Sequence, residues 1–407
     1  MGKKIVVIGG GAAGIFAAIV AASIDPETSV IVLERSKQLL AKVRISGGGR
    51  CNVTHACFEP RQLVQSYPRG NKELLGPFHH FQPKDTIEWF SQRGVHLHTE
   101  EDGRMFPSTN DSQTIIDCFL KEATRLNVQI QRMCGVSALQ KKDQLWEITT
   151  SSGEEYLADR VLLATGSQPA GHRLAKALGH HVVEPVPSLF TFNTPASPML
   201  DLAGISLKEV VARLPSLNLQ QKGPLLLTHW GFSGPAILKL SAWGARALHA
   251  CNYSTPLEIC WLPQFTPHQL QELLQCHKRE HGSMLVKNSF PVPLPRKLWQ
   301  RLVHLCNIQE DLRWSNLSKS ALMNLTNCLL GDIYQINGKT TFKDEFVTCG
   351  GVDLTEVHFK TMESRRHAGL YFAGEILNID GITGGFNFQA AWTGGWLAGH
   401  AMTSTTD

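Results

Sequence analysis

A glycine-rich turn near the start of the chain restricts the fold most, because a strand and a helix flank it in a fixed order. Residues 4–8 are a short β-branched run, typical of a strand buried in a parallel sheet. Residues 12–22 are rich in alanine and other apolar residues, as in a helix that packs on such a sheet. Between them stands Gly9-Gly10-Gly11-Ala12-Ala13-Gly14. This order predicts a Rossmann-type unit whose turn holds a pyrophosphate.

Each glycine of this turn has a distinct predicted role. Gly9 makes the turn tight, Gly11 lets the backbone approach the pyrophosphate, and Gly14 lets the helix pack closely on the strand. Free N–H groups and the positive end of the helix dipole then meet the phosphates. A second strand, residues 29–33, ends in Glu34, where this fold places an acid that binds ribose hydroxyls. The unit therefore predicts a bound nucleotide cofactor.

A second glycine turn opens the last helix of the chain, at Gly384-Gly385-Phe386-Asn387. We expect its helix N-terminal amides to lie near flavin N1 and O2, where they stabilise the anion formed when a flavin accepts a hydride. Before this turn, a strand leads into Gly374 and Glu375, where FAD proteins place an acid beside the ribitol and pyrophosphate. One nucleotide held by both ends of the chain indicates FAD, with a long insertion between the two parts of its domain.

Composition divides the chain into three segments. Residues 1–190 alternate between strand-like and helix-like patterns, and residues 184–198 then carry four prolines. We predict a first segment of the FAD-binding domain at 1–190 and its second segment at 346–407. Residues 191–345 form an inserted substrate or cap domain, with a helical part at about 266–330.

Charge and cysteine usage favour a cytoplasmic enzyme of small molecules. Lys and Arg number 39 against 35 Asp and Glu and are scattered, so we expect no nucleic-acid partner. The ten cysteines include no C-x-x-C pair and no zinc spacing, which predicts reduced thiols and no metal site. Residues 5–24 are uncharged, but three consecutive glycines argue against a membrane span, and we expect no membrane contact.

Five motifs together carry a resemblance to a known family. They are Ser46-Gly47-Gly48-Gly49-Arg50-Cys51-Asn52-Val53-Thr54, Arg104-Met105-Phe106-Pro107, residues 228–236 (THWGFSGPA), residues 348–352 (TCGGV), and residues 369–375 (GLYFAGE) running on to Gly384-Gly385-Phe386-Asn387. In this order they resemble the bacterial FAD-binding flavoproteins labelled BaiN-like or aminoacetone-oxidase-like, over essentially the whole chain. The resemblance implies an α/β fold: a Rossmann-type FAD-binding domain interrupted by an insertion with a β-barrel-like part and a small helical part. The family often has Tyr at the position of Phe386 and Asp at that of Asn378.

The predicted cofactor site collects residues from both ends of the chain. We expect the loop from Lys42 to Asn52 to cross the isoalloxazine, with Arg50 and Asn52 binding phosphate or the pyrimidine edge. Cys51 stands where disulfide reductases carry a redox pair, but the next cysteine, Cys57, is one position too far, so we favour a buried, inert thiol. The candidate cofactor-binding residues are Gly9, Gly11, Ala12, Ala13, Gly14, Glu34, Arg35, Lys42, Ser46, Gly49, Arg50, Cys51, Asn52, Val136, Ala164, Thr165, Gly166, Gly374, Glu375, Gly384, Gly385, Phe386 and Asn387.

On the substrate side, His229 is the leading acid–base candidate. Its neighbours Trp230 and Phe232, with Phe386 and Trp392, would make an aromatic wall suited to a small neutral amine or a flat enone. No second G-x-G-x-x-G follows Ala164-Thr165-Gly166, so no site for a resident nicotinamide is predicted. Electrons therefore come from the substrate itself or from an NAD(P)H molecule that visits the flavin and leaves.

Three functions stay open on this reasoning. The first is an FAD-dependent oxidoreductase that transfers hydride between flavin N5 and a small organic substrate, with NAD(P)H as a transient donor to a conjugated C=C bond. The second is an FAD-dependent oxidase of small amines that uses O2. The third is a flavin-bound protein without catalysis, or one associated with RNA. An oxidoreductase of unidentified substrate is favoured.

Overall fold

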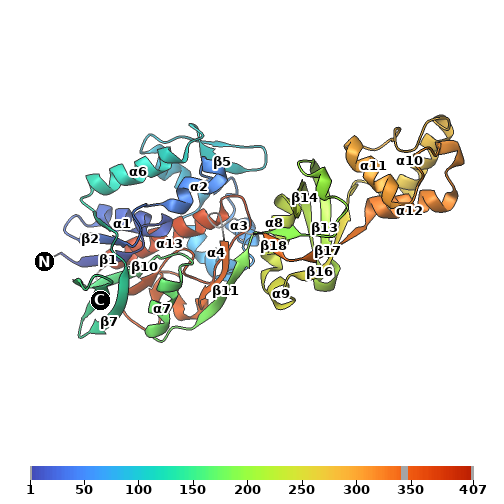
Figure 1. Ribbon diagram of the computed structural model, residues 1–407. Coiled ribbons are helices and arrows are strands. Elements are labelled where there is room, and N and C mark those ends of the chain that lie inside the picture. The colour runs from blue at the N-terminus through green and yellow to red at the C-terminus, as the bar shows by residue number, and fades with distance from the viewer. Residues whose placement is uncertain (1, 341–346, 405–407) are drawn as a thin grey trace. The chain divides into compact units, whose positions relative to one another are not determined.

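The computed structural model describes residues 2–340 and 347–404 of the chain (Figure 1). The chain divides into two units: residues 1–187 with 343–407, and residues 188–342. Each unit has its own hydrophobic core.

A seven-stranded sheet forms the centre of the first unit. Five of its strands are parallel: β22 (Leu370–Phe372), β10 (Arg160–Leu163), β1 (Lys4–Ile8), β2 (Ser29–Glu34) and β6 (Gln129–Arg132), in that order. At one edge, β21 (Glu363–Ser364) and β20 (Val357–His358) add antiparallel pairings. Residues 5–8 of β1 are almost completely buried, as the β-branched run predicts for a central parallel strand. This arrangement is the predicted Rossmann-type sheet.

Shorter elements surround this sheet in the first unit. The small sheets are β3 (Thr54–His55), β5 (Arg104–Pro107) and β4 (Leu97–Thr99); β7 (Val136–Lys142), β8 (Leu145–Thr150) and β9 (Glu155–Ala158); and β11 (Val182–Ser188) with β19 (Val347–Val352). The helices are α1 (Ala12–Ile24), α2 (Ala41–Gly49), α3 (Pro60–Leu63), α4 (Asn71–His80), α5 (Pro83–Ser91), α6 (Ser112–Arg125), α7 (Pro169–Ala177) and α13 (Phe386–Thr403).

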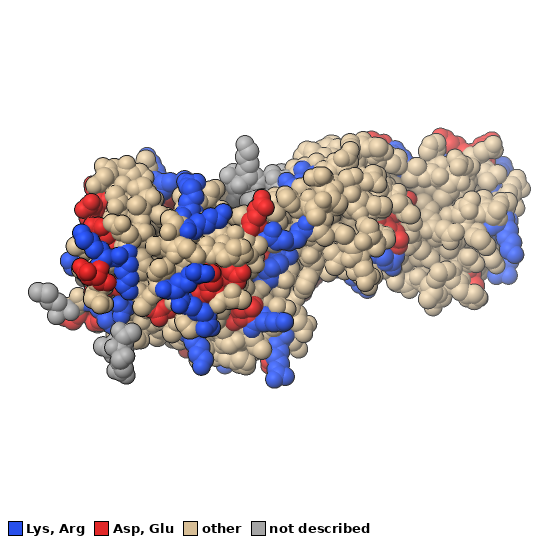
Figure 2. Space-filling view, turned by 90° about the horizontal axis from the view of Figure 1, so that it is seen from below, with Lys and Arg blue, Asp and Glu red and all other residues tan. Residues whose placement is uncertain are grey.

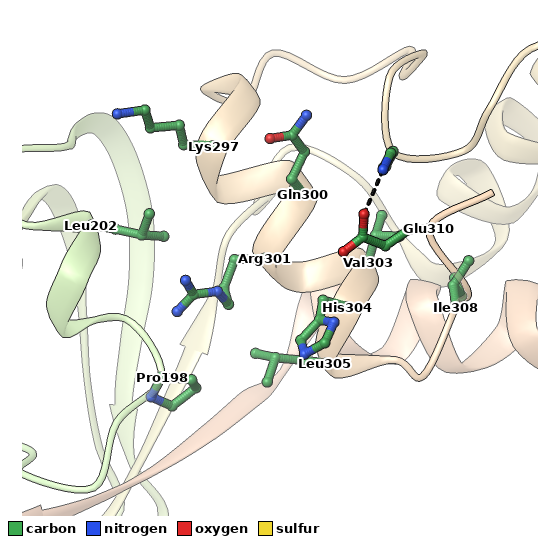
Figure 3. Close-up of a pocket in the computed structure, with 11 residues that line it drawn as sticks. Pro198, Leu202, Lys297, Gln300, Arg301, Val303, His304, Leu305, Ile308 and Glu310 are labelled. Atoms are coloured by element: carbon green, nitrogen blue, oxygen red, sulfur yellow. Dashed lines mark hydrogen bonds and ion pairs between the residues drawn. The ribbon is translucent and has the colours of Figure 1, made fainter. Parts of the chain in front are cut away.

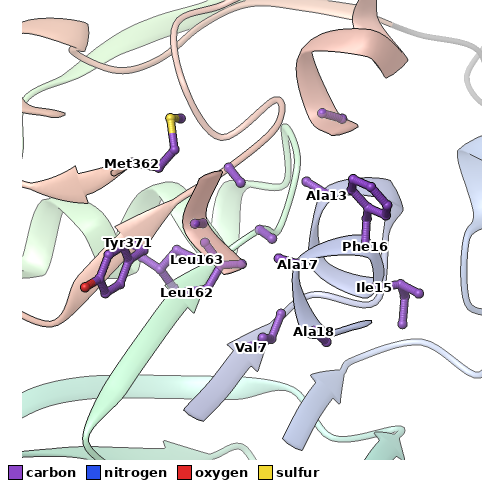
Figure 4. Close-up of a cluster of buried hydrophobic side chains, with 14 of the residues drawn as sticks. Val7, Ala13, Ile15, Phe16, Ala17, Ala18, Leu162, Leu163, Met362 and Tyr371 are labelled. Atoms are coloured by element: carbon purple, nitrogen blue, oxygen red, sulfur yellow. The ribbon is translucent and has the colours of Figure 1, made fainter. Parts of the chain in front are cut away.

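The first and last long helices, α1 and α13, pack against each other through small residues. A side chain at Gly399 would place its Cβ 2.8 Å from Cβ of Val20, and one at Gly395 would come 2.8 Å from the carbonyl oxygen of Ala13. Glycine therefore lets the two backbones approach more closely than any other residue would allow. Figure 4 shows how Ala13, Phe16 and Ala17 of α1 join the apolar cluster that includes Leu162 and Leu163 of β10. The contact ties the C-terminal segment to the N-terminal β–α unit.

The second unit combines an antiparallel sheet with helices. Its seven strands follow the order β17 (Asp332–Asn337), β16 (Ser254–Cys260), β13 (Ser206–Leu214), β14 (Leu219–Thr228), β15 (Gly231–Ser233), β12 (Thr191–Asn193) and β18 (Lys339–Thr340). Its helices are α8 (Pro235–Trp243), α9 (Ala245–Ala250), α10 (Pro267–Glu280), α11 (Arg296–Leu305) and α12 (Lys319–Leu330). This antiparallel sheet lies in the segment where the β-barrel-like part was predicted. Helices α10 to α12 form the predicted helical part.

One local prediction was wrong. Residues 42–52 were expected to be a loop, but α2 runs from Ala41 to Gly49 and is interrupted at residues 46–48. The run Ala41 to Ile45 holds residues that a helix tolerates well, while Gly47 and Gly48 take positive φ angles of 60° and 69° that end the regular helix. The expected loop is thus a short helix followed by a glycine turn.

The α1–α13 contact predicts an unusual response to a helix-favouring substitution. Alanine normally stabilises an exposed helix position by about 0.5–1 kcal/mol relative to glycine. Gly399→Ala should instead lower the free energy of unfolding by about 1–3 kcal/mol, because the new methyl group overlaps Val20. Denaturant unfolding monitored by circular dichroism measures the change.

Gly76 provides the matched control. It lies exposed in α4, and no described atom would come within 4 Å of an added Cβ beyond its immediate neighbours. Gly76→Ala should change stability by no more than about 1 kcal/mol, because its Cβ meets only the ring of the next residue, Pro77, which disfavours helical backbone before it. Equal stabilities for Gly399→Ala and Gly76→Ala would contradict a tight α1–α13 contact.

Candidate functional site

Four predicted segments meet at the carboxyl edge of the parallel sheet. The Gly9 turn follows β1, Glu34 ends β2, Ala164-Thr165-Gly166 follows β10, and Gly374-Glu375 follows β22. Because the carboxyl ends of parallel strands lie at the same edge, ligands of such sheets bind there. Segments more than 300 positions apart in the sequence therefore face one site.

The N-terminal turn has the geometry of a phosphate site. Gly9 has a φ of 115°, and a Cβ there would lie 2.4 Å from the carbonyl oxygen of Ala164. A Cβ at Gly14 would lie 2.0 Å from the carbonyl oxygen of Gly9, so both glycines are required by close packing. Around Gly11, in contrast, no described atom beyond its neighbours would come within 4 Å of an added Cβ. Helix α1 begins there without a side-chain cap from the described residues, so the N–H groups of its first turn, at Ala12 and Ala13, suit a phosphate.

Glu34 is held at the mouth of this turn by backbone N–H groups. Its Oε2 accepts a hydrogen bond of 2.6 Å from Gly10 N, and its Oε1 accepts one of 2.7 Å from Ser36 N. Each carboxylate oxygen retains further acceptor capacity for ribose hydroxyls. The next residue, Arg35, donates to Gln168 Oε1 at 3.2 Å and packs against Gly135, which precedes Val136 at the start of β7.

Lys42 and Glu375, both predicted to bind the cofactor, form an ion pair with each other. Lys42 comes from the first turn of α2, and Glu375 follows the turn at Gly374, whose added Cβ would lie 3.0 Å from Cβ of Ala13. Glu375 also approaches Gly166, where an added Cβ would lie 3.9 Å from Oε2. The structure thus brings Glu375 beside both the N-terminal turn and the turn after β10.

The second glycine turn also leaves a helix N-terminus open. Helix α13 has Gly385 as its N-cap residue, with a φ of 93° and no side-chain cap among the described residues. A Cβ at Gly385 would lie 2.5 Å from the carbonyl oxygen of Thr54. The Asn52 side-chain amide bridges the same two residues, donating to Thr54 O and accepting from Gly385 N, both at 3.0 Å. The N–H groups at Phe386 and Asn387 are therefore placed to meet an electron-rich ligand.

Several residues that hold this second turn were missed by the sequence reasoning. His55 Nδ1 lies 3.0 Å from the carbonyl oxygen of Gly384, and its ring stacks on Phe386 with centroids 4.5 Å apart. The hydroxyl of Tyr67 donates to the carbonyl oxygen of Phe386 at 2.6 Å. Arg69 forms an ion pair with the buried carboxylate of Asp380.

Asn387 closes the same turn from inside. Its side chain accepts from Gly381 N at 2.8 Å and donates to Gly381 O at 2.9 Å. One feature of the sequence could have indicated these contacts: Asp380 is a single acidic residue among mostly apolar neighbours. Its partner, Arg69, stands more than 300 positions away and could not be identified from spacing.

Arg50 and Cys51 lie in protein contacts rather than free in a loop. Arg50 donates to Glu100 Oε1 at 2.7 Å, and its guanidinium lies 3.9 Å from the centroid of Phe106. Ser46 donates to the carbonyl oxygen of Val43 at 3.1 Å and accepts, through its own carbonyl oxygen, from Cys51 N. Gly49 follows with a φ of 87° and open space beside it among the described atoms. The turn is therefore built mainly by its own backbone.

Cys51 is completely buried and has a φ of 62°. Burial raises the pKa of its thiol to about 12, although a hydrogen bond with Ser46 opposes the shift. Burial also raises the pKa of the Cys57 thiol. Both thiols therefore stay protonated at neutral pH, which supports the inert role favoured for Cys51.

The predicted aromatic wall does not form. Phe232 is completely buried in the core of the second unit, where its ring centroid lies 4.7 Å from that of Tyr334. Trp392 is buried in the core of the first unit, with its ring centroid 5.3 Å from that of Phe119. Only Trp230 is exposed, beside the exposed His229 in the turn between β14 and β15. Phe232 and Trp392 therefore pack in two separate hydrophobic cores and do not form one shared surface.

A family model described as HI0933-like protein Rossmann domain matches residues 3–401. The chain belongs to this family. The predicted resemblance and the predicted Rossmann-type α/β fold are therefore confirmed.

Relatives along nearly the whole chain have two kinds of name. The chain is 29% identical over 409 residues to a 3-dehydro-bile acid delta(4,6)-reductase of Clostridium scindens, covering 98% of each chain. It is 29% identical over 403 residues to a ribosomal RNA dihydrouridine synthase of Escherichia coli, covering 96% of each, and 28% identical to that of Haemophilus influenzae, covering 95% of each. The predicted class of oxidoreductase agrees with the reductase name.

One solved structure supports the fold over the whole chain. It is a 3-ketosteroid-delta4-(5alpha)-dehydrogenase from Rhodococcus jostii RHA1 in complex with 4-androstene-3,17-dione. It is 13% identical, covers 99% of this chain and 97% of that chain, and has a TM-score of 0.50. Within residues 2–340 and 347–404, no helix combines the length and apolar character needed to cross a membrane.

The open space at Gly11 predicts a variant that folds but does not bind the cofactor. A Cβ added at Gly11 would have no described atom beyond its chain neighbours within 4 Å, and the backbone there, with φ of −86°, suits a residue with a side chain. The valine side chain would instead occupy the space where the phosphate is expected. We expect purified Gly11→Val to lack bound flavin while its thermal midpoint matches that of the flavin-free wild type. Retention of flavin at wild-type affinity would contradict the placement of the phosphate.

The buried thiol of Cys51 predicts chemical inertness. With a pKa of about 12, its alkylation by iodoacetamide in the native protein should stay slow from pH 7 to 9, whereas an ordinary exposed thiol becomes much faster over that range. Peptide mass spectrometry measures modification site by site, with the unfolded protein as control. Fast, pH-dependent modification of Cys51, or loss of flavin reduction in Cys51→Ser, would indicate a redox role.

Proposed function

We propose that the chain is an FAD-dependent oxidoreductase that reduces a C=C bond conjugated to a carbonyl group, with NAD(P)H as a visiting hydride donor. The observation that carries the proposal is the pair of helix N-termini, of α1 and α13, that no described side chain caps. An uncapped N-terminus offers N–H donors and a positive dipole end. Two of them in one unit suit a cofactor with a pyrophosphate at one end and an electron-accepting ring at the other.

The names of the relatives support the chemistry. A 3-dehydro-bile acid delta(4,6)-reductase acts, by its name, on double bonds near a 3-oxo group. Dihydrouridine is uridine in which the ring C=C bond, conjugated to a carbonyl, has been reduced, and a synthase of it carries out that reduction. The two names share the addition of a hydride and a proton across an activated double bond. We propose this shared reaction for the present chain. We do not assign the substrate of either relative to it.

The residues of the chain have distinct proposed roles. Backbone N–H groups at Ala12 and Ala13 bind the pyrophosphate, and Glu34 binds the ribose. N–H groups at the start of α13 stabilise negative charge on the flavin pyrimidine. FAD, when bound, supplies hydride transfer at N5. The net reaction moves a hydride from NAD(P)H and a proton from an acid to the two carbons of the double bond.

The acid that supplies the proton is proposed to be His229. The side chain is exposed on a turn that the β14–β15 pairing holds through Thr228 and Gly231. Histidine is the side chain that most readily takes up and releases a proton near neutral pH. The amine oxidase alternative receives no support from the names of the relatives, and a conjugated C=C substrate is the better conclusion.

Anaerobic stopped-flow spectroscopy tests the proposal. Reconstituted with FAD, the protein should lose its visible flavin absorbance on mixing with NADH or NADPH, and recover it on mixing with a conjugated enone. Amines should leave the oxidised flavin unchanged. Gly11→Val provides the cofactor-free control. Rapid bleaching by an amine, followed by reoxidation with O2 and peroxide formation, would support the oxidase instead.

A further inference from the structure

Two of the ten cysteines, Cys306 and Cys328, lie side by side in the helical part of the second unit. Cys306 follows α11 and Cys328 belongs to the last turn of α12, and these two helices pack against each other. The two thiols share a hydrogen bond, and both side chains pack against the hydrophobic core of this unit. The two sulfur atoms therefore face each other, although residues 307–327 separate them in the sequence.

The backbone holds Cys306 firmly at the end of α11. Asn307 takes a left-handed conformation, with a φ of 55°, which ends the helix after Cys306. The N–H of Asn307 donates to the carbonyl oxygen of His304 at 2.9 Å, and the N–H of Ile308 donates to that of Val303 at 3.3 Å. These two hydrogen bonds make a Schellman motif. Because the backbone is fixed, only the side chain of Cys306 has to turn to approach its partner.

The backbone around Cys328 is fixed as well. On one side of it, the carbonyl oxygen of Asn327 accepts from Gly331 N at 2.9 Å, where α12 ends. On the other side, the carbonyl oxygen of Leu329 accepts from Trp261 N at 2.9 Å. A disulfide bond tolerates little misalignment of its two cysteines. Two thiols that already touch, each on a fixed backbone, therefore make a favourable pair.

Both thiols are half-buried, so a small reagent reaches them. The neighbours of Cys306 in the chain, Val303, Leu305 and Ile308, line a groove of about 600 Å³. Figure 3 shows Leu305 at the end of α11 and Ile308 on the segment that follows. Reactive cysteines are characteristically partly exposed, as this pair is, whereas Cys51 is completely buried.

The shared hydrogen bond gives the two thiols different acidities. It lowers the pKa of Cys306, which accepts it, and burial opposes this shift. The same hydrogen bond, together with burial, raises the pKa of Cys328, which donates it. The nearby carboxyl group of Asp332 disfavours both thiolates, but burial raises its own pKa too. Cys306 is therefore the more readily ionised thiol, and the thiolate is the form that attacks a disulfide.

We propose that Cys306 and Cys328 are a redox-sensitive pair that closes into a disulfide, linking α11 to α12, when the protein meets a low-molecular-weight disulfide. The thiolate of Cys306 attacks one sulfur of the small disulfide, whose S–S bond breaks, and the first small thiol leaves with the proton of Cys306. Cys328 then attacks Sγ of Cys306, and the second small thiol leaves with the proton of Cys328. The two cysteines are oxidised, and one small disulfide is reduced to two thiols.

The charge of the helical part favours an anionic oxidant. Residues 266–330 contain eight Lys and Arg against four Asp and Glu. Figure 2 shows blue side chains on the helical part, at the right of the view. Glutathione disulfide has more carboxylates than amines and is an anion at neutral pH, so opposite charge raises its rate of encounter with this part of the protein. It is therefore the oxidant chosen for the test.

Thiol titration and peptide mass spectrometry test the pair in the full-length protein. After incubation with glutathione disulfide and denaturation in acid, the wild type should first lose two of its ten titratable thiols. Peptide mapping should find a link between Cys306 and Cys328 that dithiothreitol removes. The link should form about tenfold or more faster than Cys276 is modified, because burial and the hydrogen bond with Glu280 raise the pKa of that thiol.

Single variants test the order of attack. Cys328→Ser keeps a hydrogen-bond donor beside Cys306 and should accumulate a mixed disulfide of Cys306 with glutathione. In Cys306→Ser, Cys328 should react about tenfold or more slowly than Cys306 does in Cys328→Ser, since its thiol ionises less readily. Cys276→Ser is the matched control, because it makes the same chemical change on α10. It should form the link at the wild-type rate.

Several outcomes would overturn the pair. They are a persistent mixed disulfide at Cys306 in the wild type, a link between two other cysteines in place of this one, ten unchanged thiols, and loss of the link in Cys276→Ser. Equal rates in the two single variants of the pair would overturn the order of attack. None of these measurements reads the flavin, so the result is independent of the proposed function.

Discussion

The close approach of α1 and α13 is the contact on which the rest of the first unit depends. Gly395 and Gly399 let the last helix lie against the backbone of the first, at distances that a methyl group would not permit. Since α1 starts at the first glycine turn and α13 starts at the second, their packing sets both helix starts in one unit. A site built from segments more than 300 residues apart therefore depends on an apolar contact that bears no functional group.

Both helix starts are kept open by the backbone geometry of their glycines. Gly9 and Gly385 take positive φ angles, and each lies too close to a neighbouring carbonyl oxygen for a side chain to fit. Around the second turn, Asn52, Tyr67 and the Arg69–Asp380 ion pair hold the backbone in place. Such preorganised N–H groups stabilise developing negative charge without having to reorient.

Much of the fold could be predicted because its signals are local in the sequence. The β1–turn–α1 unit follows from hydrophobic runs and glycine spacing within residues 4–34, and the family motifs follow from short strings. Pairings across the chain could not be predicted in this way. Lys42 with Glu375 and Arg69 with Asp380 arise only when distant segments meet. The aromatic wall failed for the same reason, because Phe232 and Trp392 were drawn into separate cores by burial.

The sequence by itself determined the family, the glycine turn after β1 and the position of Glu34 at the end of β2, since each depends on local motifs or spacing. The tertiary structure decided which charged side chains form ion pairs, and which charges lie close together in space. Charge effects decay with distance and are screened by salt, so their consequence depends on spatial neighbours more than on composition. For that reason an excess of four positive charges is small over 407 residues but larger in proportion when it falls within residues 266–330.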